Sequence, residues 1–213
     1  MGIQTVLQRI EAACARTGRN PSEVRLVAVT KGHTIEEIRE QVLAYGTFPL
    51  GESRTQEALP KMEVLSAEWH FIGPLQRNKA KFAVRFDLIH SVDSLRLAET
   101  VARKALEIGK TQPVLAEVNL SLEPQKHGFM EEELAEAVAQ MREMEGLELR
   151  GLMTIAPYTD LPETVRPIFA RLSKLADGFG LKERSMGMSG DLEVAVEEGA
   201  TLVRVGTAIF SPD

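Results

Sequence analysis

The stretch Leu202-Val203-Arg204-Val205-Gly206-Thr207 is a short apolar run that ends in a glycine and a hydroxyl. A similar arrangement stands upstream, where Met186-Gly187-Met188-Ser189 follows the short segment 183–185. The backbone N–H groups of such turns, together with a hydroxyl, offer several hydrogen-bond donors to a phosphate dianion. One glycine turn by itself usually only shapes the chain. Two in succession at the ends of strands predict a phosphate site.

Apolar and β-branched runs alternate along the chain with longer segments of helical period, which is typical of repeated βα units around a parallel sheet. The runs predict strands over 24–29, 47–50, 68–72, 88–91, 114–119, 149–153, 183–185 and 202–205. The intervening segments predict helices over 35–44, 55–65, 77–84, 94–108, 131–144, 164–179 and 192–198. An additional helix is predicted over 3–17, before the first strand.

Eight such units within 213 residues fit a closed (β/α)8 TIM barrel near its lower size limit, and an open doubly wound sheet is the alternative. A barrel gathers its chemistry at the C-terminal ends of its strands, with phosphate commonly bound after strands 7 and 8. Polar residues follow the predicted strands at Lys31, Glu52, Ser53, His70, Ser91, Asn119, Thr154, Ser189, Gly206 and Thr207. An open sheet would bring only a few of these groups into one crevice. We therefore expect an α/β barrel, with residues 1–213 forming a single domain.

Composition limits the classes of function. A hydrophobic content of 44% supports one substantial core, and the net charge of −6 with scattered basic residues argues against nucleic-acid binding. No apolar run is long enough for a membrane span and the N-terminus does not resemble a secretion signal, so we expect a cytoplasmic protein without membrane contact. The single cysteine, Cys14, excludes an internal disulfide and a thiolate metal cluster.

Lys31 stands apart from the other lysines because it follows the apolar run 24–29 directly and belongs to no amphipathic helix face. A lysine in a barrel mouth is expected to lose hydration, which favours the neutral amine that attacks an aldehyde to form an imine. Together, the lysine and the phosphate turns indicate a phosphate-bearing aldehyde as ligand.

Five collinear segments carry a resemblance to a known family: Ala28-Val29-Thr30-Lys31, Gly51 to Glu57, Trp69 to Lys79, Ser185 to Asp191 and Val203 to Phe210. They resemble the pyridoxal phosphate homeostasis proteins, which are single-domain relatives of the alanine racemase barrel. The resemblance implies a barrel that binds pyridoxal 5′-phosphate (PLP) as a Schiff base on Lys31. It also implies that Ser189, Gly206 and Thr207 hold the phosphate, that Arg204 approaches the pyridine nitrogen, and that Ser53, in place of the family's usual asparagine, touches the cofactor weakly.

An arginine facing the ring nitrogen disfavours the pyridinium form, which makes the cofactor a weaker electron sink. The family's racemase relatives also carry a second domain, and the chain ends at Asp213 without one. We therefore expect a monomeric cofactor carrier that supplies PLP to apo-enzymes, without catalysis of its own. Two alternatives stay open: a PLP-dependent racemase or lyase of low activity, and a Schiff-base aldolase acting on a sugar phosphate. The sequence does not indicate roles for His33 and the loop 119–129.

Overall fold

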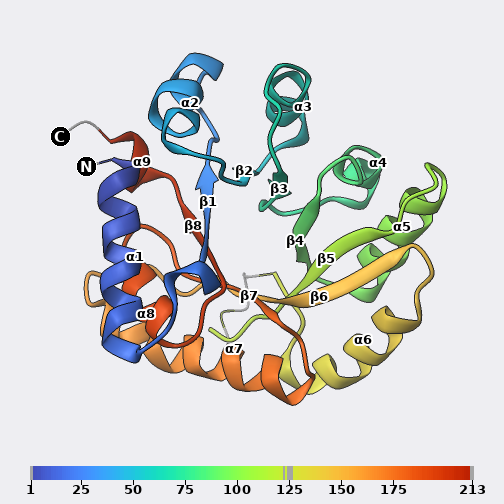
Figure 1. Cartoon of the computed structure of the whole chain (residues 1–213). Coiled ribbons are helices and arrows are strands. Elements are labelled where there is room, and N and C mark those ends of the chain that lie inside the picture. Colours follow the sequence, from blue (N-terminus) through green and yellow to red (C-terminus); the bar gives the residue numbers. More distant parts are fainter. Residues whose placement is uncertain (1, 122, 124–126, 212–213) are drawn as a thin grey trace.

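The eight strands form a closed parallel barrel in the order β1 to β8 (Figure 1). The structure is a computed structural model that describes residues 2–121, 123 and 127–211. The strands are β1 (Arg25–Val29), β2 (Leu50–Glu52), β3 (Trp69–Phe71), β4 (Leu88–Val92), β5 (Gln112–Glu117), β6 (Leu147–Met153), β7 (Glu183–Ser185) and β8 (Leu202–Val205). Pairing of β1 with β8, in register from Arg25 with Leu202 to Ala28 with Val205, closes the barrel. The predicted (β/α)8 barrel is confirmed, and the open sheet is excluded.

The helices lie around the outside of the barrel (Figure 1). They are α1 (Ile3–Thr17), α2 (Ile35–Gln41), α3 (Thr55–Val64), α4 (Ala80–Ala83), α5 (Leu95–Leu106), α6 (Glu131–Glu143), α7 (Arg166–Gly178), α8 (Leu192–Glu197) and α9 (Thr207–Phe210). Short 3₁₀ helices occupy η1 (Pro21–Glu23), η2 (Leu43–Tyr45), η3 (Arg77–Lys79) and η4 (Pro162–Val165). The additional helix predicted before the first strand is α1, which packs against α8 and α9.

Several predicted elements differ in their bounds from the structure, and the helix predicted over 35–44 divides into α2 and the 3₁₀ turn η2. The second strand begins at Leu50 instead of residue 47, because Pro49 lies before the ladder and contributes only its carbonyl, which accepts a hydrogen bond from the Ala28 N–H at 2.9 Å. The helices predicted over 77–84 and 164–179 each divide into a 3₁₀ turn followed by an α-helix. The four-residue helix α9 was not predicted, because it is too short to show a helical period.

Two hydrophobic layers hold the barrel together. The larger one fills the space between strands and helices, and the smaller one fills the barrel interior with Val27, Leu88, Leu115, Met153 and Leu202. The interior is tight at Gly51, where an added Cβ would lie 3.0 Å from a methyl group of Val27. Among the described residues, no helix combines the length and apolar character that crossing a membrane requires.

Candidate functional site

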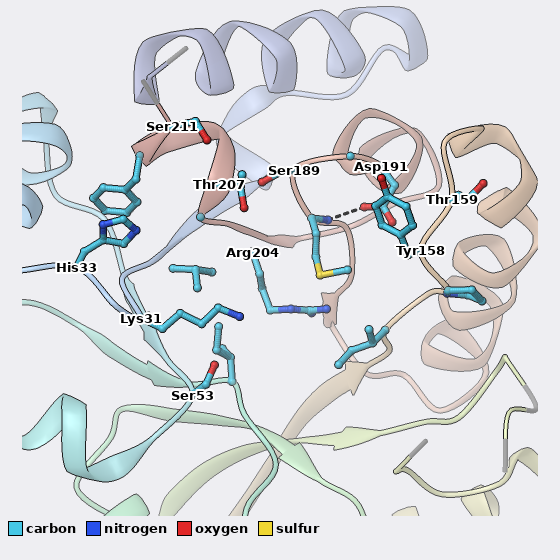
Figure 2. Close-up of a pocket in the computed structure, with 18 residues that line it drawn as sticks. Lys31, His33, Ser53, Tyr158, Thr159, Ser189, Asp191, Arg204, Thr207 and Ser211 are labelled. Atoms are coloured by element: carbon cyan, nitrogen blue, oxygen red, sulfur yellow. Dashed lines mark hydrogen bonds between the residues drawn. The ribbon is translucent and has the colours of Figure 1, made fainter. Parts of the chain in front are cut away.

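A cavity of about 660 Å³ opens at the C-terminal ends of the strands. All six residues for which a cofactor contact was predicted line it: Lys31, Ser53, Ser189, Arg204, Gly206 and Thr207. Figure 2 shows the Lys31 side chain extending into this pocket toward Arg204, with Ser53 beside it and Ser189 and Thr207 together on another wall. The closed barrel therefore brings together residues that are up to 176 positions apart, from Lys31 to Thr207.

The two glycine turns meet on one wall of the pocket. The hydroxyl of Ser189, in the turn after β7, accepts a hydrogen bond from the Ala208 N–H, in the first turn of α9, at 3.2 Å. Gly187 has a φ of +90°, and an added Cβ would lie 2.5 Å from the Cβ of Ala195. Only glycine therefore fits at this turn. The arrangement sets two hydroxyls and the start of a short helix side by side, and such groups are donors that a phosphate group accepts from.

Arg204 is the buried cation of the site. Its side chain belongs to β8 and faces the barrel interior, where it donates to the hydroxyl of Ser185 and, at 3.0 Å, to the carbonyl of Thr154. Burial lowers the pKa of Arg204 to about 10, and the carboxylates of Glu117 and Asp191 oppose this shift. The guanidinium is thus protonated at neutral pH and held in one orientation by two acceptors.

Lys31 follows β1 by two residues and is exposed to solvent. The expectation that this lysine loses its hydration is therefore wrong for the chain by itself, because the pocket is open around it. The preceding residue, Thr30, is held by a buried ion pair between Lys61 and Glu52. Lys61 Nζ lies 2.6 Å from Glu52 Oε1 and donates to the Thr30 carbonyl at 2.8 Å. The Thr30 hydroxyl donates to the same Glu52 oxygen at 2.7 Å.

Not every polar residue at a strand end reaches the pocket, so the expected convergence holds only in part. Glu52 points away from the pocket and pairs with Lys61 of α3. His70 is fully buried and bonded to Glu68 and His90, as a structural histidine would be. The hydroxyls of Ser91 and Thr154 donate to the carbonyls of Gly73 and Val118. A position at the end of a strand does not by itself show whether a side chain points into the pocket or toward the surrounding helices.

Several pocket residues were not recognised from the sequence. Asp191 lines the pocket beside Ser189 and accepts a hydrogen bond from the Met188 N–H at 2.6 Å, which the dashed line in Figure 2 marks. His33 also lines it, and its ring stacks on Phe210 with 3.7 Å between centroids. Tyr158 is a loop residue that is 92% exposed at the pocket. These residues lie in loops or in α9, where no sequence period marks them.

The loop 119–129 is described only in part. The Asn119 side chain donates to the Glu123 carbonyl at 3.0 Å, and Gly128 has a φ of +121°. Residues 122 and 124–126 of this loop lie outside the described residues. Over the part of the chain that the structure describes, no group of histidine, cysteine and carboxylate side chains could hold a metal ion.

The fold and the pocket define a class: barrel proteins with a lysine, a buried arginine and paired hydroxyl-bearing turns around one mouth. The chain belongs to the alanine racemase N-terminal domain family, whose sequence model matches residues 4–212.

The chain is similar over nearly its full length to proteins named pyridoxal phosphate homeostasis protein. The relative from Deinococcus radiodurans is 48% identical, and the alignment covers 99% of this chain and all of the relative. Two solved structures of PipY from Synechococcus elongatus PCC7942 are also similar. The structure without PLP is 38% identical with a TM-score of 0.84 and covers 96% of this chain and 99% of PipY. The structure with PLP bound is 36% identical with a TM-score of 0.82 and covers 95% of this chain and 100% of PipY.

Proposed function

We propose that this protein binds PLP and acts in PLP homeostasis, holding the cofactor as a Schiff base on Lys31 and buffering it or delivering it to apo-enzymes. The observation that carries the proposal is the meeting of Lys31, Arg204 and the two linked turns around one pocket. In this arrangement Ser189, Gly206 and Thr207 bind the phosphate, Arg204 faces the pyridine nitrogen, and Ser53 makes a minor contact.

The residues present fit this cofactor. The cavity of about 660 Å³ lies within the range of small-molecule sites. The hydroxyls of Ser189 and Thr207 flank the first turn of α9, whose leading N–H groups have no partner within the helix. The primary amine of Lys31 enters the same cavity from β1. When bound, PLP supplies the aldehyde that condenses with an amine and a ring that accepts electron density.

Relatives support the proposal. Similar proteins are named for pyridoxal phosphate homeostasis, and PipY, at 36% identity, has been solved with PLP bound. The family match also favours PLP over the sugar phosphate of an aldolase.

A carrier role agrees with the electrostatics of Arg204. A guanidinium whose pKa is about 10 keeps its proton at neutral pH, so facing the ring nitrogen it disfavours the pyridinium form. An unprotonated ring withdraws electron density less strongly, so it stabilises a carbanion only weakly. The related proteins are named for homeostasis and not for a reaction. Steady turnover of amino acids by the purified protein would contradict the carrier role and support the racemase or lyase alternative.

The binding proposal is tested by adding PLP to the purified protein, recording the visible absorbance, and reducing the mixture with borohydride before mass spectrometry. We expect one pyridoxyl adduct on Lys31 in the wild type and none on Lys31→Ala. The matched control is Lys174→Ala, which removes an exposed lysine of α7 that does not line the pocket and should keep the adduct. An unchanged adduct in Lys31→Ala, or none in the wild type, would show the proposal to be wrong.

Delivery needs a separate experiment. Protein loaded with PLP is mixed with an apo-enzyme that requires the cofactor, and recovery of its activity is followed alongside loss of absorbance from the carrier. A recovery rate that depends on carrier concentration supports direct delivery. Recovery at the rate of free PLP release indicates buffering only.

A further inference from the structure

A row of polar side chains crosses the barrel interior beneath the pocket, and all of its members except the half-exposed Glu68 are buried. The carboxylate of Glu68, just before β3, lies 2.8 Å from Nε2 of His70. Nδ1 of His70 lies 2.9 Å from Nε2 of His90, and Nδ1 of His90 lies 2.8 Å from the hydroxyl of Ser185. That hydroxyl in turn accepts a hydrogen bond from the guanidinium of Arg204. An unbroken chain of hydrogen bonds therefore connects Arg204 with Glu68.

The middle of this row, formed by the two histidines and Ser185, lies among apolar side chains. The interior side chains of the barrel are Val27, Leu88, Leu115, Met153 and Leu202, and the two histidines and Ser185 have no exposed surface. Barrels of this kind are usually filled with branched apolar residues, and a buried polar group without a partner is strongly destabilising. Each polar atom in the row has a hydrogen-bond partner, so the loss of one side chain would leave a buried polar atom of its neighbour without a partner.

The two ends fix the direction of every hydrogen bond. A guanidinium can only donate, so Ser185 accepts from Arg204. The hydrogen bond from His70, aided by Arg25 and opposed by burial, lowers the pKa of Glu68 to about 2, so Glu68 is a carboxylate that can only accept. With a single proton on each imidazole, the Ser185 hydroxyl donates to His90 Nδ1, His90 Nε2 to His70 Nδ1, and His70 Nε2 to Glu68.

The charge state of His90 agrees with this order. Burial above all, with the positive charges of Arg204 and Arg25 acting in the same direction, lowers the pKa of His90 well below its usual range. A neutral imidazole has one donor and one acceptor, which is what its place in the row requires. The opposite order would turn the lone pair of His70 Nε2 toward the carboxylate of Glu68, and these two would repel.

We propose that Glu68, His70, His90 and Ser185 form a one-way hydrogen-bond relay that positions the guanidinium of Arg204 in the pocket. None of the four lines the pocket, so they act through Arg204 as positioning residues. Glu68 borders a cavity of about 440 Å³ at the opposite end of the barrel, together with Lys110 and Arg150. A change at Glu68 therefore alters the position of the Arg204 guanidinium in the pocket.

The first test uses the protein without added ligand and does not depend on the proposed function. Protein labelled with ¹⁵N-histidine is studied by NMR, and the imidazole signals are assigned with His70→Gln and His90→Gln. We expect His70 and His90 each to carry a single proton on Nε2. A proton on Nδ1 of His90, or rapid exchange between the two forms, would overturn the relay.

The second test changes the acceptor end with Glu68→Gln and uses Arg25→Gln as its matched control. Arg25 is the other partner of Glu68, at 2.6 Å, so both variants break the same surface ion pair. Only Glu68→Gln replaces the acceptor with an amide that can also donate, which permits the reversed order. We expect a second tautomer of His90 in Glu68→Gln and the wild-type spectrum in Arg25→Gln. Equal spectra for the two variants would overturn the relay.

The third test measures the effect at the mouth and rests on the proposed function. Affinity for PLP should fall about fivefold or more in Glu68→Gln, which is the lower end of typical coupling between linked sites. In Arg25→Gln the affinity should equal that of the wild type. An equal affinity in Glu68→Gln and wild type would overturn the positioning of Arg204. If the wild type binds no PLP, the proposed function is wrong, and the histidine tautomers alone decide whether the relay exists.

Discussion

The two faces of the barrel wall at the end of β1 use a lysine in opposite ways. On the inner face, Lys31 is exposed in the pocket. On the outer face, Lys61 is buried under α3 and pairs with Glu52, and it reaches the carbonyl of Thr30, the residue before Lys31. The outer lysine therefore serves the fold, while the inner lysine is available to a ligand. Burial and partners, and not residue type, therefore separate structural from functional charges at a strand end.

The largest expected effect follows from removing the outer lysine. Lys61→Ala leaves the carboxylate of Glu52 buried with only the Thr30 hydroxyl, and its second oxygen already has no partner among the described residues. Breaking a buried pair in this way typically costs about 3–5 kcal/mol of the free energy of unfolding. Lys31→Ala should change it by no more than about 0.5 kcal/mol. Urea denaturation of both variants measures the contrast.

A control separates the buried charge from lost packing. The double variant Lys61→Met with Glu52→Gln removes both charges and keeps the volume, so it should recover most of the stability lost in Lys61→Ala. Equal losses of stability in Lys61→Ala and Lys31→Ala would show that Lys61 contributes no more to the fold than Lys31.

The inner face has a charge that opposes folding. Burial, and secondarily Asp93, raises the pKa of Glu117 to about 7, while Arg204 and His127 act against the shift. Its usual pKa of 4.5 applies to the unfolded chain, so stability is lost as pH rises from 4.5 through 7, by up to roughly 3 kcal/mol. Glu117→Gln should therefore be more stable than wild type at pH 8 and equal to it below pH 4.5. Urea denaturation across this pH range provides the measurement.

Glu132→Gln serves as the control, because Glu132 is an exposed carboxylate at the start of α6. It should follow the wild-type dependence on pH. A Glu117→Gln profile parallel to that of wild type would show that the inner face carries no such unfavourable charge.

Much of the barrel could be predicted from the sequence, because buried parallel strands read as apolar runs and the helices between them are amphipathic. The strand over 183–185 and the helix over 3–17 coincide with β7 and α1. The failures lie where local pattern is weak. Leu50–Glu52 contains a glycine and a glutamate, and its burial depends on tertiary contacts with neighbouring strands and α3.

The predicted pocket residues come together because they follow their strands directly and the barrel closes. What the sequence could not indicate is which polar residues turn inward. His70 and His90 bond to each other inside the barrel although they are 20 residues apart, and only register and closure reveal this contact. The exposure of Lys31 likewise depends on the space above it, which no local pattern encodes. The contacts of all six residues with PLP stay predictions until they are measured.

A smaller loss of stability than in Lys61→Ala is expected in the turn that faces the ligand. Ser189→Ala removes the acceptor of the Ala208 N–H at the start of α9, a loss of about 1 kcal/mol by analogy with other helix caps. The same hydroxyl donates to phosphate in our proposal, and a hydrogen bond to a charged group contributes enough to weaken PLP binding by at least about tenfold. Ser211→Ala, in the same pocket but outside the two turns, should change neither quantity. Calorimetric titration with PLP and urea denaturation give the two values, and a loss of stability without a loss of affinity would assign Ser189 to the fold alone.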